Sequence, residues 1–202
     1  MRLFNYSNLV DPILKDVRTC VAELCGMKAG DRVLDVCCGT GEQVFCYTEK
    51  GASAIGVDRN PSMIKIAEKN RQRRGFNDGI FHLASATHLP FLDDYFDCAS
   101  ISFGLHEIQR AERYKAVNEM RRVVKKEGVL MFTDFYVPLP KNCISYLIRM
   151  IEFLAGGDNY RCFNDYVAQG GLAQILKETQ LTPKKEALLK FGNLQILKVS
   201  NP

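Results

Sequence analysis

Residues 33–42 read VLDVCCGTGE, and the rest of the chain is organised around this stretch. It begins with the apolar run Val33 to Val36, which is typical of a strand buried on both faces. The run breaks at the Gly39-Thr40-Gly41 turn, and a helical pattern starts at Glu42. Glycines let a ligand approach the backbone closely, and the free N–H groups of a helix start donate hydrogen bonds. The stretch therefore predicts a nucleotide-binding loop.

Strand-like and helix-like patterns alternate on either side of this loop. Together with residues 33–36, the expected strands are 51–58, 79–83, 98–103, 128–136, 182–189 and 193–199. The last two flank Lys190-Phe191-Gly192 and predict an antiparallel C-terminal hairpin at the sheet edge. Alternating strands and helices are typical of right-handed βαβ units. The sequence thus predicts an α/β, Rossmann-like, doubly wound sheet of seven mostly parallel strands.

Helices are expected at 11–25, after Asn60, and at 110–125. In the first of these, Asp11 is the expected N-cap, Pro12 the first helical position and Gly26 the stop. The pattern changes after Pro138 and Pro140, where helices are expected at 142–155 and 163–177. A break is expected at 156–158, and Gly170-Gly171 should divide the second helix. These features predict one domain over residues 1–202, with a helical lid at about 138–171.

Composition restricts the classes of protein that fit. The chain has 202 residues, 47% of them apolar and 25% charged, which is the balance of a globular protein. No apolar run reaches the roughly 20 residues of a membrane span, and the N-terminus lacks a signal-peptide core. The eight cysteines include no Cys-x-x-Cys pair and no zinc spacing, so reduced thiols and no metal are expected. We therefore expect a cytoplasmic protein.

The identity of the nucleotide depends on what surrounds the glycines. A dinucleotide fold needs G-x-G-x-x-G, and Val44 stands at the third glycine, which disfavours a dinucleotide without excluding it. No Gly-Lys-Ser/Thr triplet follows a glycine turn, which argues against a phosphate-binding P-loop. The pattern that fits is D-x-x-x-G-x-G at Asp35, Gly39 and Gly41, with Asp58 ending the next strand.

This pattern resembles the class I S-adenosylmethionine-dependent methyltransferases, from about residue 11 to 136. Within that superfamily the chain looks most like the ubiquinone/menaquinone-biosynthesis C-methyltransferase group. The likeness rests on ASATHLPFLDDYFDCASISFGLHE at 84–107 and MRRVVKKEGVLMFTDF at 120–135. It implies in-line transfer of a methyl group from S-adenosylmethionine to a small, partly apolar molecule, with S-adenosylhomocysteine as the product.

The resemblance also implies how the cofactor is held. Asp58 would accept hydrogen bonds from both ribose hydroxyls, and Asp35 would lie near the methionyl ammonium. Ser85 stands where the family usually has an acid that accepts from the adenine amino group, and a hydroxyl can still accept this bond. Cys37 stands where many members have Gly or Ala. The implied cofactor-binding residues are Asp35, Cys37, Gly39, Gly41, Asp58, Arg59, Met63, Ser85, Ala86 and Ser102.

The sequence determines the residues that contact the methyl acceptor less well than those that hold the cofactor. His106 follows the fourth strand and is either a general base, a group that orients the acceptor, or a hydrogen-bonded loop histidine. The pair His106-Glu107 stands where the quinone-pathway enzymes commonly have Arg-Asn, which leaves the acceptor open. Further candidates for contact with the substrate are Tyr6, Tyr160 and Arg161, the last two in the expected lid.

Two other functions remain as alternatives. An RNA-directed methyltransferase is disfavoured, since Ser102-Phe103-Gly104-Leu105 replaces the Asn/Asp-Pro-Pro-aromatic motif of the amino-directed base enzymes. The chain also lacks the Pro-Cys pair of the RNA cytosine-C5 enzymes, so nucleic acid is not the expected partner. A non-catalytic module that only binds S-adenosylmethionine would show the same cofactor residues. The sequence leaves the acceptor atom and the oligomeric state open.

Overall fold

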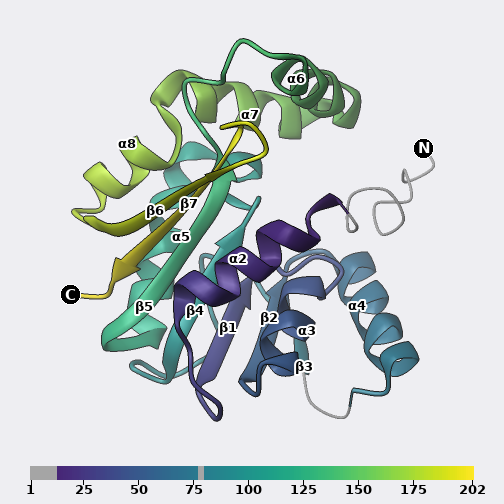
Figure 1. Cartoon of the computed structure of the whole chain (residues 1–202), viewed down its shortest axis with the longest axis vertical. Helices are drawn as coiled ribbons and strands as arrows, with labels where there is room; N and C mark the ends of the chain where they lie inside the picture. The colour runs from purple at the N-terminus through teal and green to yellow at the C-terminus, as the bar shows by residue number, and fades with distance from the viewer. Residues whose placement is uncertain (1–12, 77–79) are drawn as a thin grey trace.

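The structure is a computed structural model that describes residues 13–76 and 80–202. One sheet with the strand order β3-β2-β1-β4-β5-β7-β6 runs through its centre (Figure 1). The strands are β1 (Arg32–Val36), β2 (Ser53–Asp58), β3 (Ile80–Leu83), β4 (Phe96–Ser102), β5 (Val124–Phe135), β6 (Pro183–Leu189) and β7 (Leu194–Ser200). The strands from β3 to β5 pair in parallel, and β7 is antiparallel to both β5 and β6. The predicted sheet and its closing hairpin are confirmed.

Helices cover both faces of the sheet. In Figure 1, α2 (Lys15–Cys25) and α3 (Glu42–Glu49) lie in front of it, and α5 (Arg110–Val123) lies behind it. The helix α4 (Pro61–Arg74) packs on β2 and β3, and α8 (Gly171–Glu178) packs on β5 and α5. The two-sided cover buries the central strands on both faces, as the uninterrupted burial of residues 33–36 shows.

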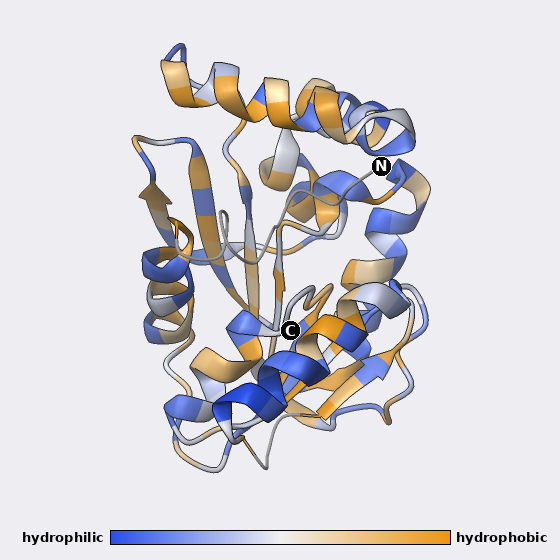
Figure 2. Cartoon of the chain, turned by 90° about the vertical axis from the view of Figure 1, so that its right-hand side faces the viewer, coloured by the Kyte–Doolittle hydropathy of each residue, from blue (hydrophilic) through white to orange (hydrophobic). Residues whose placement is uncertain are grey.

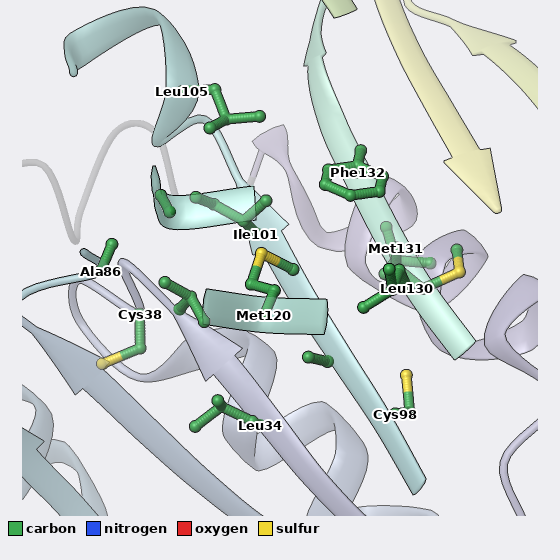
Figure 3. Close-up of a cluster of buried hydrophobic side chains, with 14 of the residues drawn as sticks. Leu34, Cys38, Ala86, Cys98, Ile101, Leu105, Met120, Leu130, Met131 and Phe132 are labelled. Carbon is green, nitrogen blue, oxygen red and sulfur yellow. The ribbon is translucent and has the colours of Figure 1, made fainter. Parts of the chain in front are cut away.

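The core is built from the central strands and the helices against them. Figure 3 shows Leu34 of β1, Ile101 of β4, Leu130 to Phe132 of β5 and Met120 of α5 within one buried cluster. These side chains are essentially inaccessible to water. Burying a side chain of this size contributes roughly 1.5–3 kcal/mol each, so this cluster holds the scaffold on which the loops at the strand ends rest.

Several helix ends follow the expected chemistry. The Asn60 side chain caps α4 by accepting from the Ser62 N–H at 2.9 Å, with Pro61 at the first position. Gly26 ends α2 in a left-handed conformation, as predicted. The expected start of that helix at Asp11 and Pro12 lies outside the described residues, within which α2 begins at Lys15.

Two boundaries differ from the expectation. The strand β5 begins at Val124, directly after α5, rather than at Gly128. The helix α7 (Gly157–Gln169) begins six residues before Phe163, so Asp158 lies in its first turn and only Gly156 separates it from α6. On α5, Arg113 is fully buried whereas its neighbour Tyr114 is only half-buried. Hydropathy patterns place an arginine on the solvent side and cannot show that a partner buries it.

A helical layer lies beyond the carboxyl ends of β4 and β5. It consists of α6 (Cys143–Ala155) and α7, and α7 packs on the short 3₁₀ helix η1 (Leu105–Glu107) that follows β4. Asn142 caps α6 by accepting from the Ser145 N–H at 3.0 Å, and Gly170 turns the chain from α7 into α8 as predicted. No helix within residues 13–76 and 80–202 is long and apolar enough to cross a membrane.

Candidate active site

Asp58, at the end of β2, joins the glycine loop to the start of the next helix. Its Oδ2 accepts from the Gly39 N–H at 2.9 Å, and its Oδ1 accepts from the Asn60 N–H at 2.8 Å. Each carboxylate oxygen can accept a second hydrogen bond. The carboxylate is therefore already oriented, and it keeps acceptor capacity toward a ligand in the cleft.

The two glycines of the loop have different roles. A Cβ added to Gly39 would meet nothing within 4 Å, so this position borders open space. A Cβ added to Gly41 would lie 2.6 Å from Cζ of Phe81, so the close approach of loop and strand requires glycine there. Cys37 just before them has a φ of 58°, a left-handed conformation that favours glycine and explains why a small residue suits the position. Burial raises the pKa of its thiol, which argues against a reactive thiolate.

A pocket lies beside this loop at the carboxyl ends of the parallel strands. It gathers the predicted residues Cys37, Asp58, Arg59, Ser85 and Ala86. The residues that line it are Cys37, Asp58, Arg59, Ala84, Ser85, Ala86, Thr87, Gly104, Glu107, Ile108 and Glu112. Three carboxylates thus face one guanidinium, which favours a cationic ligand over an anionic pyrophosphate.

A larger hollow of about 670 Å³ lies elsewhere, beside α2 and the hairpin turn. None of the predicted cofactor residues lines it; its walls are Ile13, Lys15, Asp16, Thr19, Cys20, Glu23 and Lys190. The smaller pocket is the better candidate, because ligands of open parallel sheets bind beyond the carboxyl ends of the strands.

Asp35 lies near the end of β1 and is 3% exposed. Ser100 on the neighbouring strand β4 donates its hydroxyl to Oδ1 at 2.6 Å. Burial raises the pKa of Asp35 to about 7, because it outweighs the hydrogen bond from Ser100, which lowers the pKa. A buried carboxyl poised near neutrality can stabilise a cation that comes close to it.

The loop after β3 supplies hydroxyl groups. Ser85 Oγ lies 2.9 Å from Thr87 Oγ1 and accepts from the Thr87 N–H at 3.2 Å. Ser85 is exposed and Ala86 is buried beside it. Met63, in the first turn of α4, is half-buried and does not line the described pocket.

Ser102, the last residue of β4, also lies outside the lining of that pocket. Its Oγ and the Oγ1 of Thr133, its register partner on β5, are buried with no hydrogen-bond partner among the described residues. Unsatisfied buried hydroxyls are uncommon, and these two stand at the strand ends next to η1.

His106 of η1 is 2% exposed and lies among charged groups. Its Nδ1 is 2.6 Å from Asp134 Oδ1, and its Nε2 is 3.7 Å from Glu152 Oε1 of α6. Burial alone would lower the pKa of His106, but Asp134, Glu152 and Glu107 outweigh it and raise the pKa to about 9. The ring is thus an imidazolium at neutral pH, and Phe135, Phe163 and Tyr166 surround it.

The predicted acceptor contacts are not brought together. Tyr160 is half-buried on α7, with its ring edge against Phe153. The Arg161 side chain is 82% exposed and 3.5 Å from Asp158, so it faces solvent. Tyr6 lies outside the described residues.

Sequence reasoning missed the groups that hold the helical layer in place. Arg113 donates to the carbonyl oxygens of Leu105 and Ile108 at 2.9 Å, and to Asp165 Oδ2 and the Cys162 carbonyl oxygen on α7. Asp134 was also missed, although an acid ending the most apolar strand was a detectable signal. Within the described residues no three His, Cys, Asp or Glu side chains form a group that could hold a metal.

The pocket fits the cofactor that the resemblance implies. Open space faces Gly39, Asp58 retains acceptor capacity beside it, and acidic side chains outnumber basic ones in the lining, which suits a positively charged sulfonium and ammonium. The residues that would hold it are Asp35, Gly39, Asp58, Ser85 and Ala86.

Comparisons with known proteins agree with this geometry. The C-methyltransferase UbiE of ubiquinone/menaquinone biosynthesis from Pectobacterium carotovorum is 37% identical over 123 residues, 59% of this chain and 48% of that protein. The demethylmenaquinone methyltransferase of Paenarthrobacter aurescens is 35% identical over 142 residues, 68% of this chain and 53% of that protein. The chain spans about half the length of the curated relatives it matches.

A solved structure shows the same fold. The SAM-dependent methyltransferase from Aquifex aeolicus has a TM-score of 0.70 and 16% identity, and the match covers 92% of this chain and 89% of that one. The model of the ubiE/COQ5 methyltransferase family matches residues 12–147, about two thirds of the chain, and implies S-adenosylmethionine as the cofactor. The chain belongs to the ubiE/COQ5 methyltransferase family.

Proposed function

We propose that the protein transfers a methyl group from S-adenosylmethionine to a small, partly apolar, quinone-like acceptor. The observation that carries this is the pocket beyond the strand ends, which three carboxylates and one guanidinium line and whose Asp58 accepts from the N–H of the glycine loop at Gly39. The names of the relatives, which refer to ubiquinone, menaquinone and demethylmenaquinone, support a quinone-like acceptor. At His106-Glu107 the chain differs from the Arg-Asn pair that the quinone-pathway enzymes commonly have. These two residues would therefore distinguish its acceptor from the acceptors of those enzymes.

The bound cofactor supplies an electrophilic methyl group, and the protein's residues position and desolvate the reactants. Asp58 would hold the ribose hydroxyls with its already oriented carboxylate. Asp35 would balance the charge of the methionyl ammonium. Ser85 and the Ala86 N–H would bind the adenine, with Arg59 and Met63 beside the ring. Ser102 would contact the cofactor from the end of β4, where its hydroxyl has no partner among the described residues.

On the acceptor side, we propose that His106 orients the methyl acceptor and does not remove a proton from it. An imidazolium has no free lone pair to accept a proton, and both ring nitrogens already face carboxylates. Tyr160, on the layer above, is the better candidate than Arg161 for direct contact, because its ring is half-buried while Arg161 faces solvent. Residues 138–171 would then act as the lid of a single domain.

The setting that we propose is a cytoplasmic enzyme with a small-molecule partner rather than nucleic acid. All eight cysteines are free thiols, as a reducing compartment favours. The family that the chain matches favours a methyltransferase of small molecules over an RNA-directed methyltransferase, and over a module that only binds the cofactor.

The first test is calorimetric titration with S-adenosylhomocysteine. Asp58→Asn should weaken binding roughly ten- to hundredfold, the cost of hydrogen bonds to a charged group. Asp97→Asn is the matched control, because Asp97 also accepts a backbone N–H, from Arg32 at 2.8 Å, but at the start of β4. Equal affinity of the Asp58 variant and the wild type would refute the assignment, as would no binding of either S-adenosylmethionine or its product.

The second test is release of S-adenosylhomocysteine in the presence of quinols, phenols, thiols and small RNAs. Turnover on a quinol or phenol is the expected result. Turnover on RNA alone would contradict the small-molecule acceptor, and binding without turnover on any compound would favour the non-catalytic module.

A further inference from the structure

The helix α6 presents its apolar side to solvent. Six large side chains on it are between 48% and 71% exposed: Tyr146, Leu147, Met150, Ile151, Phe153 and Leu154. At 100° per residue these six fall within an arc of roughly 160°. We call this arc the α6 face. In Figure 2, α6 runs along the top of the molecule and its ribbon carries apolar bands.

The opposite side of α6 is attached to the body through both polar and apolar groups. Ser145 donates its hydroxyl to Asn193 Oδ1 at 2.6 Å, and Glu152 lies 3.7 Å from His106. Ile148 is buried with them, and Ile144 is partly buried against the core. Most large apolar side chains of α6 are nevertheless exposed, whereas an ordinary surface helix buries its apolar stripe. Of the six side chains on the α6 face, Phe153 has its ring against Tyr160, and the other five are available for another partner.

The charges around the α6 face indicate which partner that is. Between residues 138 and 157 the sequence has three charged residues, Lys141, Arg149 and Glu152. Glu152 is buried, whereas Lys141 and Arg149 are exposed, so this segment offers only positive charge to its surroundings. A twofold dimer through the face would bring like charges together, whereas anionic headgroups would complement them.

A second element extends the apolar surface. Phe191, in the turn between β6 and β7, is 87% exposed. This turn lies against the start of α6, where Asn142 Nδ2 is 3.5 Å from the Phe191 carbonyl oxygen. An aromatic ring beside an apolar helix face with flanking cations matches the pattern of segments that lie in a membrane interface.

We propose that the α6 face docks on the surface of an anionic lipid bilayer, with α6 lying in the plane of the interface. The helix sits in the layer beyond the strand ends, so docking would turn the side of the molecule that carries the candidate site toward the lipid (Figure 1). The inference rests on the exposure and charge of the helix and is independent of the identity of the acceptor.

Vesicle flotation with the full chain tests this proposal. Vesicles of phosphatidylcholine with phosphatidylglycerol should carry the wild type upward, and pure phosphatidylcholine should carry less of it. Met150→Glu with Leu154→Glu, at the centre of the face, should weaken binding at least tenfold, because two charges would enter the interface. The control is Leu92→Glu, a still more exposed leucine in the loop before β4, which should bind like the wild type.

The contribution of the two cations to vesicle binding is tested by the double variant Lys141→Gln with Arg149→Gln. Binding to the anionic vesicles should fall about fivefold for each charge removed, with little change on neutral vesicles. Unchanged affinity of each variant for S-adenosylhomocysteine verifies that it is folded. The proposal is overturned if the wild type does not float with either vesicle, or if Leu92→Glu loses binding as strongly. A wild-type dimer in light scattering that Met150→Glu dissociates, without vesicle binding, would instead assign the face to a second copy.

Discussion

At the scale of single residues, Asp58 shows how a binding group can be prepared before the ligand arrives. Its two oxygens are fixed by the N–H groups of Gly39 in the glycine loop and of Asn60 at the start of α4. A carboxylate held in this way loses little conformational freedom on binding. Asp58 therefore has a structural and a binding role at once, and the substitution by Asn separates the two better than Ala does.

The two glycines of the loop should respond differently to alanine. Gly39→Ala should leave the protein folded at a cost of about 1 kcal/mol for the left-handed backbone, and should weaken S-adenosylhomocysteine binding because the methyl group faces open space. Gly41→Ala should cost more, about 2–4 kcal/mol in the free energy of unfolding, because Phe81 must move. Urea denaturation and calorimetry on both variants measure this. A larger loss of stability for Gly39→Ala would contradict it.

His106 should make stability depend on pH. Its pKa is raised in the folded protein, so its contribution is complete below about pH 6.5 and is lost as the pH rises toward 9. The free energy of unfolding should fall across this window by up to about 3 kcal/mol. Urea denaturation between pH 6 and 9 provides the measurement, and His106→Asn should flatten the slope. The exposed His82→Asn is the control, and an identical slope in both variants would disprove the role of His106.

At the scale of elements, Arg113 joins three helices. It extends from α5 to the carbonyl oxygens of η1 and to Asp165 and Cys162 on α7. Its guanidinium also lies 5.6 Å from the ring centre of Tyr166, which itself donates to the Phe135 carbonyl oxygen on β5. The position of the helical layer over the strand ends depends on this cluster of hydrogen bonds.

Arg113→Met should therefore loosen α7 and reduce the free energy of unfolding by about 3 kcal/mol, because buried acceptors lose their donor. Urea denaturation gives the stability, and hydrogen exchange of the α7 amides gives the local effect. Arg110→Met, one turn away on the same helix and half-exposed with Glu178 3.9 Å from it, should cost under 1 kcal/mol. Equal costs for the two variants would show that Arg113 has no special structural role.

Elements with strong local patterns could be predicted from the sequence. The glycine turn after β1, the helix start after Asn60 and the closing hairpin each depend on neighbouring residues, and the structure has them where they were expected. The abrupt change from α5 to β5 at Val124 could not be foreseen, because apolar residues at 123 and 124 fit either pattern. The outward apolar side of α6 was equally invisible, since periodicity shows that a stripe exists but not which way it faces.

At the scale of the whole molecule, the candidate site likewise contains residues that the sequence could identify and residues that it could not. Asp35, Gly39 and Asp58 could be identified because one motif and the next strand end contain them. The cluster of His106, Asp134 and Glu152 comes from η1, β5 and α6, and only the folded sheet and its helical layer bring these residues together. The position of a site residue relative to the sheet could be inferred from the sequence, whereas contacts between elements far apart in the chain could not.

The place of β7 has a consequence for how the chain reaches this fold. This strand lies between β5 and β6, and register pairs such as Val129 with Ser200 join residues far apart along the chain. Until β7 arrives, the edge of the apolar strand β5 is uncovered, and an uncovered edge of this kind can pair with another molecule. Losses to aggregation during refolding should accordingly grow with protein concentration, and dilution should favour recovery of the native sheet.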